Sequence, residues 1–127
     1  MKRTLFLTLA VLVLCISVCT GGTLLLKNIL DRADRLRSEA ILAVEGNNPD
    51  HAMEIMVELA ELWKQNTPVM EVLTSHDALH EVESGIMEAQ ICLECDDHDD
   101  FLRTISIVGA GMDHLNDVEH ISLSNLY

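Results

Sequence analysis

The hydropathy pattern begins with an uninterrupted apolar stretch near the N-terminus. Thr4–Leu26 contains 23 consecutive residues without a charged side chain and is dense in Leu, Val and Ile. As a helix it would be roughly 35 Å long, which exceeds the hydrocarbon core of a bilayer at about 30 Å. The pattern predicts a transmembrane helix. We assign residues 1–27 to an N-terminal membrane anchor that contacts lipid through residues 4–26.

The same pattern is also typical of a cleaved secretory signal. Lys2 and Arg3 precede the apolar residues, and small residues suited to cleavage occur near 17–22. Apolarity resumes at residues 24–26, beyond any plausible cleavage point, which favours an uncleaved anchor. Basic residues after the stretch would place the remainder in the cytoplasm by the positive-inside rule. The very short N-terminal flank fits a signal anchor instead, so we expect a single-pass cell-membrane protein whose bulk is extracytoplasmic.

Beyond the apolar stretch, hydrophobic residues recur at helical spacing in successive segments. The anchor helix is expected to continue to about Val44 and to end at Gly46 in a left-handed conformation. Asn48 followed by Pro49 is typical of a helix N-cap with proline at the first helical position. These residues predict a second helix that ends near Asn66.

Thr67 and Pro68 repeat this pattern of an N-cap followed by proline and predict a third helix that runs to Cys95. Its expected packing seam, at steps of three and four residues, is Val72, Ser75, Leu79, Val82, Ile86, Ala89 and Leu93. A fourth helix has the seam Phe101, Ile105, Val108, Met112 and Leu115. Val118–Tyr127 lacks a helical period, so we expect it to be an irregular tail.

The expected fold is therefore all-α. An N-terminal transmembrane helix continues into a small antiparallel helical bundle with an irregular C-terminal tail, and residues 28–127 form one acidic helical-bundle domain. We detect no internal repeat and no strand alternation. Gly109 and Gly111 weaken the fourth helix by up to about 1 kcal/mol each unless the backbone of a neighbour packs closely there.

Charge restricts the possible partners. All 21 acidic residues but only five of the eight basic residues lie in Asp31–Tyr127, which gives this segment a formal charge of −16. Such a surface repels phosphate backbones, so we expect no nucleic acid partner.

His76 and His80 share one helix face, with Glu83 one turn further on. This spacing makes His76, His80 and Glu83 a candidate metal site. The alternative is a structural polar cluster in which a half-buried His76 hydrogen-bonds a carboxylate such as Glu83 or one in the tail. A metal-dependent hydrolase is disfavoured because zinc peptidases have glutamate where Asp77 stands, and because a third remote ligand and a substrate cleft would be required.

Cys92, Cys95 and His98 form a second candidate cluster with the spacing C-x-x-C-x-x-H. A structural zinc site needs a fourth ligand, and the chain has no second C-x-x-C motif. An extracytoplasmic location would allow a local disulfide between the two cysteines. They could equally be small residues at a helix end. We attribute the acidic residues around His98 to the start of the next helix and not to calcium binding.

A set of residues along the chain resembles a known family. Trp63, then His76 thirteen residues later, the segment 79–83 and the tail segment 119–126 resemble an uncharacterised domain-of-unknown-function family of small single-anchor helical membrane proteins from low-GC Gram-positive bacteria. The resemblance covers nearly the full chain and implies a membrane-anchored helical domain without an established activity. The family usually has an acid at the position of His80, which fits a structural or sensing role better than a fixed zinc pair.

These patterns favour a membrane-anchored, non-enzymatic interaction or structural module. We expect it to dock on another membrane or cell-envelope protein, through the tail or beside Gly109 and Gly111, and to hold no cofactor. The alternative is a metal- or redox-responsive sensor that uses one of the two clusters described above.

Overall fold

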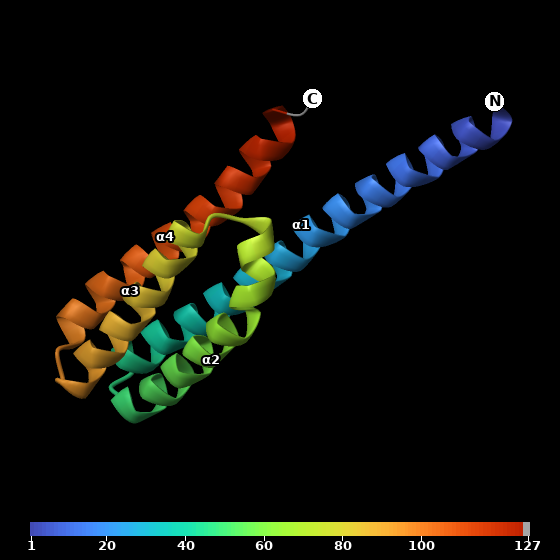
Figure 1. Ribbon diagram of the computed structural model, residues 1–127. Helices are drawn as coiled ribbons and strands as arrows, with labels where there is room; N and C mark the ends of the chain where they lie inside the picture. Colours follow the sequence, from blue (N-terminus) through green and yellow to red (C-terminus); the bar gives the residue numbers. More distant parts are fainter. Residues whose placement is uncertain (126–127) are drawn as a thin grey trace.

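A computed structural model describes the backbone of residues 1–125 and the side chains of residues 1–116. It consists of the helices α1 (Lys2–Glu45), α2 (Pro49–Leu73), α3 (His76–Glu94) and α4 (His98–Asn125). Each helix packs against the next in the chain, and α4 also packs against α1. The helices thus close an up-and-down bundle, and the N-terminal part of α1 projects from one end (Figure 1). The prediction of an all-α fold is confirmed for the described residues.

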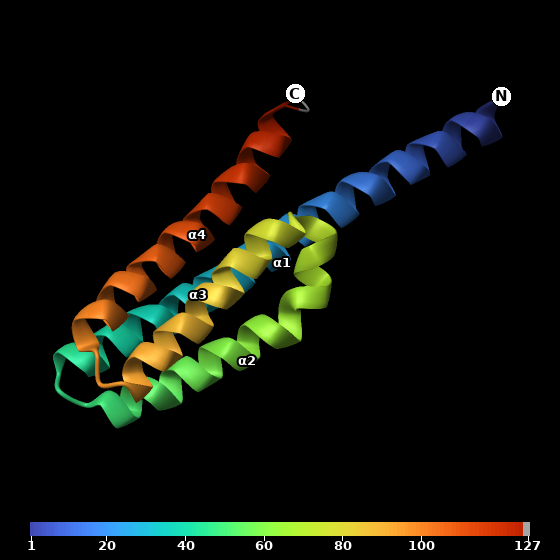
Figure 2. The same cartoon turned by 60° about the vertical axis from the view of Figure 1, so that its left-hand side comes forward.

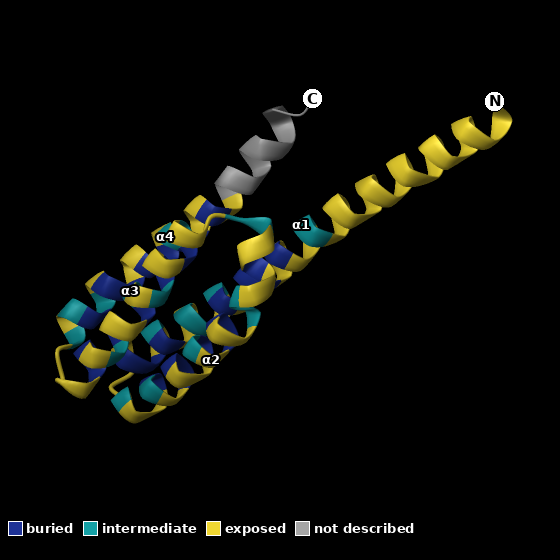
Figure 3. Ribbon diagram, viewed as in Figure 1, coloured by how far each residue is buried: buried dark blue, intermediate teal, exposed yellow. Residues whose placement is uncertain are grey.

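α1 combines the apolar N-terminal stretch with one wall of the bundle, as predicted. The side chains of residues 1–21 are exposed, and burial begins at Leu26 (Figure 3). The helix is long and apolar enough near its N-terminus to cross a membrane. The apolar surface that is free to contact lipid is shorter than Thr4–Leu26, because Leu26 belongs to the bundle core. The buried residues of α1 follow helical spacing: Leu26, Ile29, Leu30, Ala33, Ala40, Ala43 and Val44.

The α1–α2 turn corrects the predicted end of the first helix. Gly46 is the C-cap with a φ of −81°, and the left-handed residue is Asn47, with a φ of 63°. The N–H groups of Asn47 and Asn48 donate to the carbonyls of Val44 and Ala43 at 3.1 and 2.8 Å. This hydrogen-bond pattern requires the left-handed residue one position after the C-cap, and asparagine adopts that conformation readily.

The α3–α4 turn has the same geometry as the α1–α2 turn. Asp96 is left-handed with a φ of 55°, and the next residue, Asp97, caps α4 by accepting the N–H of Asp100 at 3.2 Å. In the α1–α2 turn, Asn48 accepts the N–H of His51 at 3.3 Å, which confirms the predicted N-cap. Both turns lie at the end of the bundle that is far from the projecting part of α1 (Figure 1).

The shared turn is part of an internal repeat. Residues 39–60 and 88–109 align without a gap, and their patterns of burial are nearly the same. The expectation of no repeat is therefore wrong. A helix pair needs only apolar residues at buried positions and turn formers between them, so few identities remain to reveal the repeat. The identical pairs are Glu39 and Glu88, Ala40 and Ala89, Glu45 and Glu94, and Asp50 and Asp99.

α2 passes through Pro68, so the predicted start of a third helix at Thr67 and Pro68 is wrong. Pro68 has no N–H to donate to the preceding turn, and α2 bends in this part of its course (Figure 2). Thr67 does not cap a new helix, because its Oγ1 donates to the carbonyl of Trp63 at 2.7 Å. Met70, beyond the proline, is fully buried, and its packing holds this last part of α2 on the bundle.

α3 consequently begins at His76, with Ser75 as its N-cap, and is shorter than predicted. The packing seam begins at Leu79, because Val72 belongs to the end of α2 and is 85% exposed. From Leu79 onward every predicted seam residue of α3 is buried. The five predicted seam residues of α4 are buried as well.

The C-terminal segment corrects a further prediction. α4 continues to Asn125, so most of the expected irregular tail is helical. The expectation rested on the missing hydrophobic period of this segment. Such a period indicates that a helix packs against a neighbour, and a helix can form without it. Residues 126–127 lie outside the described part of the chain.

Two side-chain hydrogen bonds fix α2 against α3. The indole Nε1 of the buried Trp63 donates to the carbonyl of Leu79 at 3.3 Å, and Nε2 of Gln90 donates to the carbonyl of Met56 at 3.3 Å. The two bonds lie at different heights along these antiparallel helices and therefore fix their register.

Candidate functional site

α3 and α4 approach closely because glycine faces valine twice across their contact. A Cβ placed on Gly85 would lie 2.7 Å from Cγ2 of Val108, and one on Gly111 would lie 3.0 Å from Cγ2 of Val82. Each helix thus contributes a valine and, three residues later, a glycine. Each valine fills the space beside the glycine of the other helix. This reciprocal packing sets the register of α3 and α4.

We expect Gly85→Ala to lower the free energy of unfolding by about 1 kcal/mol. Overpacking against the branched Val108 costs about 1–3 kcal/mol and exceeds the helix-propensity gain of up to about 1 kcal/mol. Urea unfolding in mild detergent, followed by circular dichroism, measures the change. Gly109→Ala is the control, because its Cβ would meet the guanidinium of Arg37, a flexible side chain that can move. Equal destabilisation by both variants would contradict the packing argument.

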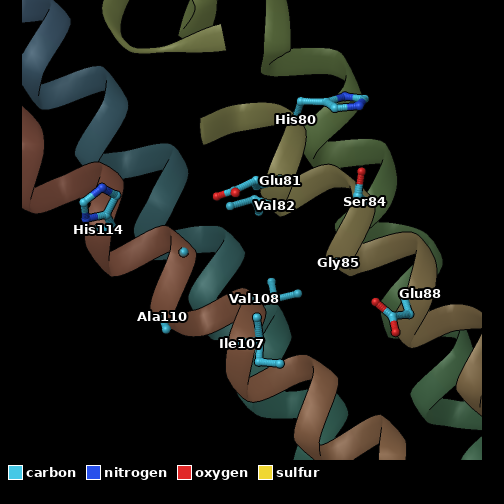
Figure 4. A pocket seen from close by; sticks show the side chains of 11 residues that line it. His80, Glu81, Val82, Ser84, Gly85, Glu88, Ile107, Val108, Ala110 and His114 are labelled. Atoms are coloured by element: carbon cyan, nitrogen blue, oxygen red, sulfur yellow. The ribbon is translucent and has the colours of Figure 1, made fainter. Parts of the chain in front are cut away.

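On the outer side of this contact an open groove of about 550 Å³ runs between α3 and α4 (Figure 4). Its small lining residues are Ser84, Gly85, Ala110 and Gly111. Its polar lining residues are His80, Glu81, Glu88 and His114. The exposed Ile107 adds an apolar side chain to the α4 wall. The groove exists because small residues occupy the positions where the two helices are closest.

The groove carries negative charge from Glu81 and Glu88. Among the side chains that the structure describes, neither Glu81 nor Glu88 has a cationic group within ion-pair distance. Arg103 lies one turn before Ile107 on α4 and binds Asp100. Nη2 and Nε of Arg103 lie 2.6 and 2.9 Å from Oδ1 of Asp100. This contact lowers the pKa of Asp100 and raises the pKa of Arg103. Glu81 therefore remains available to a cationic ligand, whereas Arg103 partly offsets the charge of Glu88.

The predicted metal ligands His76, His80 and Glu83 do not converge on one point. Nδ1 of His76 lies 2.9 Å from Oε1 of Glu71, and Nδ1 of His80 lies 3.9 Å from Oε2 of Glu83. The two imidazole rings stack with their centroids 6.4 Å apart. Within the described residues, the structure contains no group of three or more His, Cys, Asp or Glu side chains that could hold a metal ion. The metal site stays a prediction. His76 does contact a carboxylate, but the partner is Glu71 and not Glu83, and the side chain of His76 is 74% exposed and not half-buried.

The second predicted cluster is divided between different environments. The buried thiol of Cys92 lies 3.7 Å from Oδ2 of Asp100 and 4.0 Å from Oγ1 of Thr104, on α4. Cys95 is the exposed C-cap of α3, and both thiols are free. Nε2 of His98 is buried and has no hydrogen-bond partner among the described groups. Cys92 therefore serves the α3–α4 contact, and no disulfide joins it to Cys95 in this structure.

The two cysteines are expected to differ strongly in reactivity. Burial raises the pKa of the Cys92 thiol, and the charge of Asp100 adds to this, although the hydrogen bond with Thr104 opposes it. Because the thiolate is the reactive form, a maleimide should modify Cys95 roughly 100-fold faster than Cys92. Mass spectrometry of Cys92→Ser and Cys95→Ser, each also lacking Cys15 and Cys19, measures both rates.

The difference should disappear in urea, where both thiols are exposed. The neutral thiol of Cys92 is favoured in the native state, so its contribution to stability is complete at neutral pH. That contribution should be lost as the pH rises above about 8.5, where the unfolded thiol ionises first. Equal labelling rates in the folded protein would show that Cys92 is not buried as described.

Comparisons of the chain with protein-family models, curated proteins and solved structures found no match. The resemblance to the uncharacterised Gram-positive family therefore stays a prediction.

The groove was only partly predictable from the sequence. Gly109 and Gly111 were singled out as places of close packing, but their neighbours are the side chains of Arg37 and Val82 and not a backbone. Gly85 and the two glutamates were not identified. The spacing V-x-x-G, which occurs in both 82–85 and 108–111, could have indicated Gly85, but it does not locate the glutamates.

Proposed function

We propose that this chain is a membrane-anchored, non-enzymatic interaction module that docks on another membrane or cell-envelope protein. The exposed apolar part of α1 supports membrane anchoring. The open groove between α3 and α4, lined by Glu81 and Glu88, is the observation that carries the docking function. We further propose a single membrane span with the bundle on the extracytoplasmic side.

The chemistry of the groove favours a basic helix as the docking partner. Two antiparallel helices with small residues between them offer a third helix a close approach. Ile107 supplies apolar contact, and Glu81 and Glu88 lie two helical turns apart on α3. A partner helix that carries Lys or Arg two turns apart beside small residues would complement both the shape and the charge.

A synthetic helical peptide tests this proposal with the full chain in bilayer nanodiscs. The peptide carries an alanine ridge and two lysines seven residues apart, and its control has glutamates in their place. Fluorescence anisotropy measures both Kd values. The lysine peptide should bind more tightly, and less so at high salt.

Two pairs of protein variants complete the test. Ala110→Trp, at an exposed lining position, should block the groove and weaken binding more than tenfold, whereas Val57→Trp, on the exposed surface of α2, should not. Glu81→Gln with Glu88→Gln should weaken binding about 2- to 30-fold, since each exposed ion pair contributes about 0.2–1 kcal/mol. Equal affinity for Ala110→Trp and Val57→Trp would overturn the groove as the docking surface.

A further inference from the structure

Exposed apolar side chains occur at the anchor end of the bundle, on the last turns of α2. Val72 is 85% exposed and Val69 is 43% exposed, and a spacing of three residues places both on one face of the helix. Leu24 and Leu25 of α1 are exposed as well. Other exposed aliphatic side chains, such as Leu42, Val57 and Ile107, are scattered over the bundle, whereas these four lie at its anchor end.

A packing contact fixes the height of these valines relative to the anchor. A Cβ placed on Gly22 would lie 2.8 Å from Cδ2 of Leu73, so the last turn of α2 is level with Gly22. The exposed N-terminal part of α1 ends at the residue before Gly22. Figures 1 and 2 both show the α2–α3 connection beside α1 at this level.

The length of the exposed segment shows where the lipid boundary falls. Thr4–Gly21, the part of α1 that is both exposed and free of charge, has 18 residues and is roughly 27 Å long. A hydrocarbon core of about 30 Å is therefore long enough to include about two more residues of α1, Gly22 and Thr23. If α1 is tilted, the core includes further residues of the helix. The boundary thus falls at the height of Leu73, and Val72 lies beside it.

We propose that the last turns of α2 rest in the lipid interface, with Val69 and Val72 in contact with the bilayer. The proposal rests on the membrane anchoring proposed above and adds a second lipid contact beside α1. Segment 69–75 contains one charged side chain, Glu71, which faces His76 at 2.9 Å and so enters the headgroup region with a partner. With two separate contacts, the bundle is held at a fixed tilt to the membrane.

Fluorescence quenching in liposomes of phosphatidylcholine and phosphatidylglycerol tests this proposal with the full chain. The native cysteines are replaced, and single cysteines at Val72→Cys, Val57→Cys or Leu12→Cys carry a bimane label. Phospholipid spin-labelled near the headgroup should quench the label at Val72 at least twofold more than the label at Val57. The emission of the Val72 label should also shift to shorter wavelength.

Leu12 lies near the middle of the exposed apolar segment, so its label is tested with phospholipid spin-labelled deep in the acyl chain and reports on the anchor itself. Quenching at Leu12 without excess quenching at Val72 would overturn the lipid contact and leave the anchor intact. Absence of quenching at both positions would overturn the anchoring as well. Quenching at Val72 that depends on the protein-to-lipid ratio would assign the valines to a second copy of the chain, and would also overturn the proposal.

Discussion

Trp63→Ala is expected to lower the free energy of unfolding by about 3–5 kcal/mol, which is a large part of the stability of a small domain. Trp63 is 1% exposed and is the largest fully buried side chain described in the bundle. Its removal leaves a cavity between α2 and α3 and also removes the indole donor to Leu79. Urea unfolding in mild detergent, followed by circular dichroism, measures the loss.

Two further variants divide this effect into its parts. Trp63→Phe keeps most of the ring but loses the N–H donor, and should cost less than the alanine variant. Leu42→Ala, at an exposed position of α1, should change stability by no more than about 0.5 kcal/mol. A loss below about 1 kcal/mol for Trp63→Ala would be incompatible with its position in the core.

Two arginines in the middle of the exposed apolar segment, Leu12→Arg with Val13→Arg, are expected to release the chain from the membrane. Each arginine near the bilayer centre costs about 2.5–3.5 kcal/mol on the insertion scale, whereas Leu, Ile, Phe and Val contribute about −0.3 to −0.6 kcal/mol each. The segment Thr4–Gly21 contains ten such residues, a gain of roughly 3–6 kcal/mol. The two substitutions therefore cancel or exceed the whole driving force.

Alkaline carbonate extraction of membranes followed by immunoblotting measures this release. The unmodified chain should stay in the pellet, and the double variant should appear in the supernatant or be degraded. Leu42→Arg, at an exposed position within the bundle, is the matched control and should stay in the pellet. A double variant that still resists extraction would refute the assignment of this segment as the anchor.

Hydrophobic periodicity was sufficient to predict most of the fold. The seam of α4 and that of α3 from Leu79 onward are buried as expected, because a helix that packs on one side must repeat its apolar residues every three or four positions. The N-cap at Asn48 was also predictable, since its short side chain followed by proline has a specific local role. The predictions were correct where local chemistry and packing agreed.

The errors arose where local signals conflicted with packing across the bundle. Pro68 is a helix terminator in isolation, but the burial of Met70 beyond it continues α2 with a bend. Glycine is the usual left-handed residue after a helix, yet the hydrogen bonds of the α1–α2 turn place Asn47 there. The groove depends on which helix faces Gly85 and Gly111, and this is a property of the assembled bundle that periodicity does not contain.

The antiparallel order of the helices has a practical consequence for labelling this protein in cells. α4 runs back toward the projecting end of α1, so with the proposed anchoring a reporter domain appended at the C-terminus would lie close to the bilayer surface (Figure 1). The hairpin tips at Asn47 and Asp96 are exposed and point the opposite way. An epitope inserted at either tip would be readable by an antibody on whichever side of the membrane the domain occupies.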